Sequence, residues 1–262
     1  MKLRTYRITM QFLIFVSLNL GLIISFHGFP LPVFYCHACP FATALCPLGA
    51  MEYAVIVSPI LILYIFGVLS LFGGTFGRAT CGWACPIGAL QDLIGKKAKY
   101  RDVKKLRPFR YVKYILLILT LILSYLLSEK VFCDYCPIGF LTGTIPTLII
   151  MPGFVEPLEP FFIIKIILTF GFFILVLSIV RGWCKYICPI GAQLSLFNKI
   201  SLVKITYDES KCSFCYMCRR VCPMGIDPMR ESDSPECIRC GRCVEICPQK
   251  ALKFELRKPY VR

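Results

Sequence analysis

Four long apolar stretches limit what this chain can fold into. They cover residues 8–26, 54–76, 111–128 and 161–180, and each approaches the roughly 20 residues that an α-helix needs to cross a bilayer. Hydrophobic residues make up 57% of the 262-residue chain and charged residues only 17%, which is too apolar for a soluble globular domain. The sequence therefore predicts a membrane α-helical protein with four transmembrane helices.

The distribution of basic residues predicts how these helices are oriented. Nine Lys and Arg residues lie between the second and third stretches, whereas the segment 28–53 between the first and second has none. By the positive-inside rule, both termini face the cytoplasm, and the protein is a multi-pass protein of the cell membrane in contact with lipid. The same distribution explains the net charge of +15 without nucleic acid as a partner.

The first 200 residues contain an internal duplication. Each copy has an apolar stretch, a Cys-x-x-Cys-Pro motif, a second apolar stretch and an Arg-x-x-Cys-x-x-x-Cys-Pro-Ile-Gly-Ala motif. The last motif begins at Arg78 in the first copy and at Arg181 in the second. Because both copies start on the cytoplasmic side, they are predicted to be parallel repeats, about residues 1–100 and 101–200, related by a pseudo-twofold axis along the membrane normal.

The segment 207–255 is polar and contains two cysteine runs of the spacing Cys-x-x-Cys-x-x-Cys-x-x-x-Cys-Pro. This is the bacterial two-cluster ferredoxin pattern, in which the fourth cysteine of each run binds the iron of the other cluster. The pattern predicts a cytoplasmic α+β ferredoxin-like domain with two 4Fe-4S clusters. A pair of zinc sites is the alternative. The predicted ligands are Cys212, Cys215, Cys218 and Cys247 for one cluster, and Cys237, Cys240, Cys243 and Cys222 for the other.

The last motif of each repeat supplies two more cysteines, near the cytoplasmic ends of the second and fourth spans. A duplicated Cys-x-x-x-Cys across a twofold axis gives four thiolates, the number that a 4Fe-4S cluster needs. The prolines that follow favour a helix start, where free backbone N–H groups stabilise an anionic cluster. We expect an intramembrane cluster, with reduced thiols packed as small hydrophobic groups as the alternative. Its predicted ligands are Cys81, Cys85, Cys184 and Cys188.

The Cys-x-x-Cys motifs of the outer side follow the same duplication. Either they hold a second intramembrane cluster or each motif closes a disulfide. The symmetric Pro and Gly context favours the cluster. Its predicted ligands are Cys36, Cys39, Cys133 and Cys136, with Cys46 as a substitute, because Cys46 begins a Cys-Pro-Leu-Gly-Ala run that echoes Cys136-Pro-Ile-Gly-Phe. The flanking apolar segments 38–50 and 138–151 are expected to re-enter the membrane, surrounded by protein.

Two pairs of residues near these motifs have more than one interpretation. His27 and His37 are candidates for binding a metal or a quinone head group, although an interfacial histidine without such a role is more common. Arg78 and Arg181 can raise the potential of a cluster by their charge, but anchoring at the cytoplasmic interface already explains them.

These motifs resemble those of the NapH/MauN-type membrane ferredoxins, which are four-span polyferredoxins associated with quinol oxidation. The resemblance covers nearly the whole chain: the four spans, the Cys81/Cys85 and Cys184/Cys188 motifs and the two-cluster unit. The outer cysteines depart from the family pattern. The resemblance implies an electron-transfer subunit of an oxidoreductase complex, which carries electrons between cytoplasmic iron-sulfur clusters, the quinone pool and partner redox subunits.

Two other functions fit the same motifs. One is a maturation factor, similar to the membrane ferredoxins that assist the assembly of copper oxidases, in which the clusters reduce a metal during its insertion. The other is a transmembrane thiol-disulfide conduit, in which electrons leave through the outer Cys-x-x-Cys motifs. Substitution of the outer cysteines distinguishes a bound cluster from disulfides on the outer side. The protein loses iron if these cysteines hold a cluster, and it loses none if they form disulfides.

Overall fold

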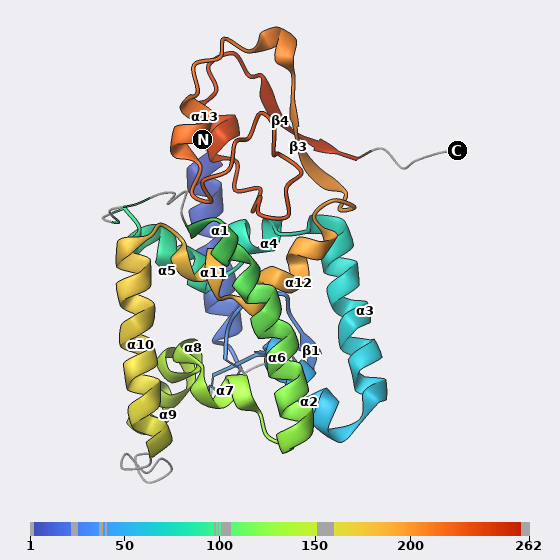
Figure 1. The fold of residues 1–262 in the computed structure, drawn as a ribbon, viewed down its shortest axis with the longest axis vertical. Coiled ribbons are helices and arrows are strands. Elements are labelled where there is room, and N and C mark those ends of the chain that lie inside the picture. Colours follow the sequence, from blue (N-terminus) through green and yellow to red (C-terminus); the bar gives the residue numbers. More distant parts are fainter. Residues whose placement is uncertain are drawn as a thin grey trace.

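A computed structural model describes residues 3–21, 26–36, 39, 41–96, 98, 100, 106–150 and 160–257 of the chain. It has a helical part, followed from about residue 203 by a smaller C-terminal part that contains the two cysteine runs (Figure 1). The C-terminal part covers one end of the helical part. The N-terminus lies at the same end, where the first helix contacts the C-terminal part.

The first repeat is a series of helices that start at prolines. Three of its helices have Pro at the first turn, where the missing N–H costs no hydrogen bond. The two short strands pair in parallel. In chain order its elements are α1 (Leu3–Leu18), β1 (Phe26–Pro30), β2 (Ala44–Leu45), α2 (Pro47–Val57), α3 (Pro59–Phe76), α4 (Ala79–Trp83) and α5 (Pro86–Ile94).

The second repeat follows a similar order. Its elements are η2 (Pro108–Tyr111), α6 (Val112–Leu127), α7 (Val131–Tyr135), α8 (Pro137–Gly139), η3 (Phe140–Thr144), α9 (Ile145–Ile150), α10 (Pro160–Ser178), α11 (Gly182–Tyr186) and α12 (Pro189–Phe197). The helix pair α11–α12 matches the pair α4–α5, with five residues in the first helix and nine in the second. The duplicated cysteine motif is therefore also a duplicated pair of helices.

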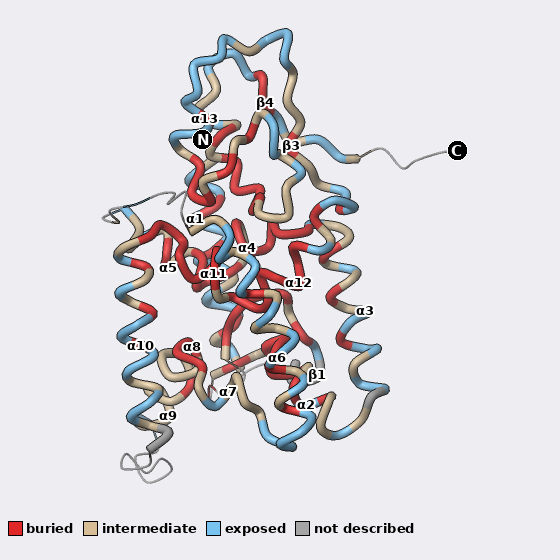
Figure 2. Tube along the Cα trace, in the orientation of Figure 1, coloured by how far each residue is buried: buried red, intermediate tan, exposed pale blue. Residues whose placement is uncertain are grey.

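The two short helix pairs pack between the long helices of both repeats. α5 contacts α1 of its own repeat and α10 of the other, whereas α12 contacts α6 of its own repeat and α3 of the other. Figure 2 shows the centre of the helical part, around α4, α11 and α12, as largely buried. The long helices α3, α6 and α10 instead expose large apolar side chains, such as Ile60, Ile115 and Ile167.

The C-terminal part has the α+β architecture that the sequence predicts. Its strands β3 (Val203–Tyr207) and β4 (Leu252–Leu256) are antiparallel, and Ile205 pairs with Phe254. The first strand begins before the predicted domain start at residue 207. Between the strands lie η4 (Glu209–Lys211), α13 (Met217–Val221) and α14 (Arg242–Ile246). The two cysteine runs are thus held between one pair of strands.

The predicted membrane spans fit the helices unevenly. The continuous helix formed by η2 and α6, Pro108–Leu127, is long and apolar enough to cross a membrane. The third and fourth predicted spans agree with α6 and α10 to within two residues. Elsewhere in the described part of the chain, the apolar helices are shorter, at Pro47–Val57, Ile60–Phe76, Pro137–Ile150 and Phe162–Ser178.

The first two predicted spans are wrong at their boundaries, each for a local reason. α1 already ends at Leu18, where the chain turns and the Gly21 N–H donates to the Phe41 carbonyl at 2.9 Å. The second span is broken at Ser58, which is extended (φ −162°) because a proline disfavours helical backbone in the residue before it. Residues 54–57 therefore belong to α2, and α3 begins at Pro59.

Candidate iron-sulfur sites

The two cysteine runs surround two separate cavities. In each cavity, three of the lining cysteines come from one run and the fourth comes from the other, which is the grouping that the ferredoxin spacing predicts. The first-run site, with about 350 Å³ of space between the atoms, is lined by Cys212, Cys215, Cys218 and Cys247. The second-run site, with about 370 Å³, is lined by Cys222, Cys237, Cys240 and Cys243.

Short helices deliver the fourth cysteine of each run to the other cavity. Cys218 lies in α13 and Cys243 in α14. Cys222 and Cys247 cap the C-termini of these helices in an extended conformation, directly before a proline. Because α13 and α14 contact each other, the cysteine at the end of each helix reaches across to the partner run.

These cavities suit a cluster better than a single ion. No three Cys, His, Asp or Glu side chains among the described residues converge closely enough to hold one metal ion. Zinc, with Zn–S bonds of about 2.3 Å, draws its four thiolates to within about 4 Å of one another. A 4Fe-4S cube holds its thiolates at the outer corners, farther apart. Four cysteines around an open cavity therefore fit the cube.

Burial affects the protonation of the second-run thiols. It raises the pKa of Cys237 to about 12 and also raises the pKa of Cys222. Backbone N–H groups, such as that of Arg239 beside Cys237, oppose the shift without cancelling it. A thiol with a raised pKa stays neutral at physiological pH, so iron has to displace its proton on binding.

The four cysteines of the duplicated helix pairs come together at the centre of the helical part, and we call them the inner site. Cys81 lies in α4 and Cys184 in α11, whereas Cys85 and Cys188 are the N-terminal caps of α5 and α12. All four are buried, and Cys85 and Cys188 each interact electrostatically with both Cys81 and Cys184. Their convergence agrees with the expected shared site. That they ligate a cluster stays a prediction.

Polar groups face the sulfur atoms of the inner site. Gln91 Nε2 donates to Cys184 Sγ at 3.1 Å, and the Gly191 N–H donates to Cys188 Sγ at 3.4 Å. Hydrogen bonds to a ligating thiolate stabilise its negative charge and tune the potential of the cluster that it binds.

Two buried arginines tie the repeats together across the inner site. Arg78 Nη2 donates to the Cys184 carbonyl at 3.1 Å, and Arg181 Nη1 donates to the Cys81 carbonyl at 3.0 Å. Each arginine thus binds the backbone of the cysteine-bearing helix in the other repeat. Both side chains are completely buried, so interfacial anchoring, which the sequence suggests for them, is wrong.

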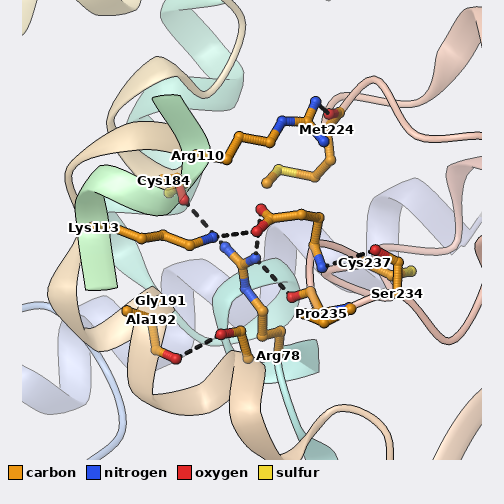
Figure 3. A network of polar contacts seen from close by, with 12 residues as sticks. Arg78, Arg110, Lys113, Cys184, Gly191, Ala192, Met224, Ser234, Pro235 and Cys237 are labelled. Atoms are coloured by element: carbon orange, nitrogen blue, oxygen red, sulfur yellow. Dashed lines mark hydrogen bonds and ion pairs between the residues drawn. The ribbon is translucent and has the colours of Figure 1, made fainter. Parts of the chain in front are cut away.

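Different carboxylates balance the two arginines. Arg78 Nη1 lies 3.0 Å from a Glu236 carboxylate oxygen, and Lys113 Nζ lies 2.5 Å from the other oxygen of the same group. Arg78 also donates to the Pro235 carbonyl, so the network joins the helical part to the loop that precedes Cys237 (Figure 3). The second arginine, Arg181, pairs with Asp92 on α5 instead.

Asp92 joins three segments of the chain. Its carboxylate lies 2.7 Å from Arg181, 3.3 Å from Arg7 on α1 and 3.0 Å from Arg242 on α14. Burial raises the pKa of this carboxyl, but the surrounding positive charges outweigh burial and lower it to about 2. Sequence reasoning missed Asp92 and Glu236 because neither belongs to a motif. The available signal was weak: Asp92 is the only charged residue of α5.

The C-terminal part docks on the helix that carries Cys81. A side chain at Gly82 would lie 2.5 Å from a backbone carbonyl oxygen of the second-run loop and 3.4 Å from the Cα of Cys240, so only glycine permits this approach. The adjacent Trp83 Nε1 donates to the Arg239 carbonyl at 2.9 Å. The inner site and the second-run site are therefore neighbours.

The outer cysteines line a further cavity of about 320 Å³. Four cysteines contribute to its wall, Cys36, Cys46, Cys133 and Cys136. Cys39, which the sequence assigns to this group, packs in another apolar cluster, and Cys46, the predicted substitute, takes its place. All 17 cysteines of the chain lie in described segments, and none of them forms a disulfide in the structure.

The structure does not test the roles suggested for the two candidate histidines. His27 is part of β1, and His37 lies outside the described residues. Their suggested roles stay predictions.

Comparison with known proteins shows two iron-sulfur families in the chain. A family described as "4Fe-4S binding domain" matches residues 58–108, 109–150 and 161–206, which is more than half of the chain. A family described as "4Fe-4S dicluster domain" matches residues 204–248. No solved structure matches significantly.

Several curated proteins are similar over most of the chain. An uncharacterized protein of Methanocaldococcus jannaschii is 36% identical over 204 residues, which are 73% of this chain and 76% of that protein. The ferredoxin-type protein NapH of Haemophilus influenzae is 28% identical, over 72% of this chain and 67% of the relative. The methylamine utilization ferredoxin-type protein MauN of Methylobacillus flagellatus is 27% identical, over 60% of this chain and 51% of the relative.

The chain belongs to the NapH/MauN-type family of 4Fe-4S ferredoxin proteins, and the resemblance carried by its motifs is confirmed. It is an iron-sulfur electron-transfer protein.

Proposed function

We propose that this protein is a membrane-integral electron-transfer subunit. The first-run, second-run and inner sites each hold a 4Fe-4S cluster, and together they connect cytoplasmic redox carriers with the membrane. The observation that carries the proposal is the twofold construction of the inner site. Each repeat supplies two cysteines and one buried arginine, and each arginine binds the cysteine-bearing helix of the other repeat.

The inner site suits a 4Fe-4S cluster in the number and charge of its groups. Four buried thiolates make a complete ligand set. Arg78 and Arg181 place positive charge beside the site and offset the negative charge of thiolate ligands. A bound cluster supplies one-electron chemistry. The protein's own residues hold it in place, exclude water and donate hydrogen bonds to its sulfur ligands.

The four-span topology is part of this proposal. The exposed apolar side chains of α3, α6 and α10 suit helices that face lipid. We assign α1, α3, α6 and α10 to the four spans, with η2 extending α6. The start of α1 and the C-terminal part lie at the same end of the helical part (Figure 1), which agrees with a cytoplasmic location for both under the positive-inside rule.

A quinone is the proposed redox partner within the membrane. A broad apolar cleft lies between α1, α3, α4 and the strands β3 and β4. Its wall includes Thr80, Trp83 and Ala84, which are chain neighbours of Cys81 and Cys85. A quinone ring in this cleft would therefore lie beside the inner site.

Other redox subunits are the proposed partners on the cytoplasmic side. Cys215 of the first-run site is exposed, and so are the neighbouring side chains of Phe214, Tyr216 and Met217. An exposed cluster ligand surrounded by apolar and aromatic side chains suits transient contact with another electron carrier.

Paired cysteine variants test the inner site. Cys85→Ala and Cys188→Ala should each remove the same EPR signal and about four irons per chain, and the double variant should lose no more than either alone. The signals of the C-terminal part should persist. Cys39→Ala is the matched control, because Cys39 is similarly buried but lies outside the inner site. Separate signals for the two variants, or full iron content in the double variant, would refute the shared site.

A further inference from the structure

A second set of four cysteines, which we call the outer site, meets inside the helical part. Cys36 and Cys46 come from the first repeat, and Cys133 and Cys136 come from the second. Their cavity, about 320 Å³, is close in size to the first-run and second-run cavities at about 350 and 370 Å³. The division of two cysteines per repeat is the same as in the inner site.

Cys46 has the backbone conformation of the inner-site caps. It is the N-terminal cap of α2, with φ −64° and ψ 124°, and proline occupies the first helical position. Cys85, Cys136 and Cys188 cap α5, α8 and α12 in the same way, with φ from −72° to −59° and ψ from 111° to 120°. Cys46 is therefore the structural counterpart of Cys136, as the shared Cys-Pro-x-Gly sequence suggests.

A glycine three residues after each of these cysteines turns its N–H toward the sulfur. Gly139 and Gly191 each donate to the preceding cap cysteine at 3.4 Å. Gly49 stands in the same position after Cys46, and its N–H faces that sulfur. A backbone N–H directed at sulfur stabilises a ligating thiolate. Cys46 thus has the same backbone setting as the cysteines that cap the inner-site helices.

Cys39 lies in a different environment. It packs in an apolar cluster with Leu18, Val33 and Ala42, and the Tyr35 hydroxyl lies 3.8 Å from its sulfur. It is not among the residues that line the outer-site cavity. The Cys-x-x-Cys spacing pairs Cys36 with Cys39 in the sequence, but the fold pairs Cys36 with the Cys46 cap in space.

A buried carboxylate holds the second-repeat side of the outer site. Glu52 on α2 is fully buried and accepts hydrogen bonds from the Phe132 N–H at 2.7 Å, the Cys133 N–H at 3.2 Å and the Ser124 hydroxyl at 3.0 Å. It thereby fixes the start of α7 against α2. Burying a carboxylate in an apolar bundle is costly unless it is hydrogen-bonded. The three hydrogen bonds of the Glu52 carboxylate therefore indicate that this side chain positions the segment around Cys133.

Phe34 forms a wall shared by the outer and inner sites. Its ring lines the outer-site cavity and stacks on Trp183, with ring centroids 6.3 Å apart and planes inclined by 16°. Its backbone N–H faces the sulfur of Cys85. One continuous apolar core contains two cysteines of the outer site, three of the inner site and all four of the second-run site. The outer site therefore extends the row of sites that begins in the C-terminal part.

We infer that Cys36, Cys46, Cys133 and Cys136 bind an additional 4Fe-4S cluster, with Cys46 rather than Cys39 as the fourth ligand. Glu52 is a positioning residue that orients the Cys133 segment. This inference deepens the proposed function and rests on it, because the outer cluster lies beyond the inner site, in the half of the helical part that is remote from the C-terminal part (Figure 1).

Alanine variants of the full chain, purified anaerobically in detergent, test the ligand set. Cys46→Ala should lose about four irons and four acid-labile sulfides per chain, and Cys39→Ala should keep the wild-type content. The two cysteine residues are 6% and 5% exposed, so both variants change a similarly buried residue. Retention of iron in Cys46→Ala, or equal loss in both variants, would overturn the assignment.

Further variants distinguish the loss of a ligand from the loss of the fold. Cys133→Ala, in the opposite repeat, should lose the same EPR signal as Cys46→Ala, and the double variant should lose no more iron than either alone. Glu52→Leu should shift the outer EPR signal while Glu52→Gln, which keeps a carbonyl acceptor, restores it. An additive iron loss in the double cysteine variant contradicts a shared site. An unshifted signal in Glu52→Leu contradicts the positioning role.

Cys85→Ala distinguishes a failure of this inference from a failure of the proposed function. It should remove the inner signal and leave the outer one. If Cys85→Ala lost no iron while Cys46→Ala did, the outer site would stand and the inner cluster would fail. If Cys46→Ala lost none while Cys85→Ala did, the outer site alone would be overturned.

Discussion

The C-terminal part and the helical part build their cysteine sites in opposite ways. In the C-terminal part, three cysteines of each site lie in one short run, and a single cysteine comes from the other run. In the helical part, the inner and outer sites take two cysteines from each repeat, from positions far apart in the sequence. A site of the first kind is visible in the spacing of a motif. A site of the second kind depends on how two repeats pack.

The two regions also differ in what holds their sites in place. The first-run site lies partly at the surface, with an exposed Cys215. The inner site is enclosed by fully buried arginines, whose carboxylate partners come from α5 and from the C-terminal part. Changes in the C-terminal runs should therefore remove single clusters, whereas changes in the buried ion pairs of the helical part should weaken the packing of the whole molecule.

Removal of the cysteine that each run contributes to the site of the other run should give the largest effect. Cys222→Ala is expected to remove about four irons from the second-run site and leave the first-run site, although Cys222 stands in the first run. Cys247→Ala should do the reverse. EPR spectra and iron content measure the outcome. If each variant emptied the site of its own run, the grouping of the cavity-lining cysteines would be wrong.

Loss of the Asp92 charge should have the next largest effect. Asp92→Asn leaves Arg181, Arg7 and Arg242 without their carboxylate, and breaking a buried ion pair costs about 3–5 kcal/mol. The temperature at which half of the cluster absorbance is lost should fall clearly below the wild-type value. Glu255→Gln, which removes an exposed pair with Lys253, is the control and should change little. Equal shifts in both variants would contradict a central role for Asp92.

Adding a methyl group at the contact between the helical part and the C-terminal part should have an intermediate effect on stability and on electron transfer. Gly82→Ala forces the second-run loop away from α4, at a cost of about 1–3 kcal/mol for an overpacked contact. Reduction of the inner site through the C-terminal clusters should slow, as followed by stopped-flow spectroscopy. Gly67→Ala on α3 meets no atom within 4 Å and is the matched control. Unchanged rates in Gly82→Ala would show that the two regions exchange electrons by another route.

The smallest effect concerns pH. Because the folded pKa of Asp92 is lowered to about 2, its contribution to stability is present above the unfolded value near 4 and is lost as the pH falls toward about 2. The stability difference between the wild type and Asp92→Asn should therefore be the same at pH 5 and pH 8. Thermal loss of cluster absorbance at the two pH values measures it. A difference that shrinks toward pH 5 would mean that Asp92 is not held ionised.

The features that sequence predicts well are local. The ferredoxin grouping follows from spacing, and α6 and α10 follow from the length of uninterrupted apolar stretches. The break at Ser58 was also signalled locally, by Pro59, but the apolar run around it is continuous and hides the proline's effect. Hydropathy alone therefore merges the end of α2 with α3.

The features that sequence misses depend on tertiary contacts. Cys39 and Cys46 are both plausible partners for Cys36, and only the packing of α2 brings Cys46 into the cavity. Arg78 and Arg181 look like interfacial anchors because basic residues commonly lie at the ends of membrane spans. Each arginine binds a backbone carbonyl of the other repeat. These reciprocal contacts arise from the twofold packing, which no single stretch of sequence encodes.

The pairing of Arg78 with Glu236 has a consequence for the order in which the protein is made. The two residues are 158 positions apart, so the ribosome completes both repeats before it adds the carboxylate that neutralises this buried guanidinium. An unpaired buried charge costs several kcal/mol, which holds the repeats short of their final packing until the C-terminal part has emerged and folded onto them. We therefore expect the inner site to reach its final packing only after the C-terminal part has folded, and cofactor loading there to be a late step.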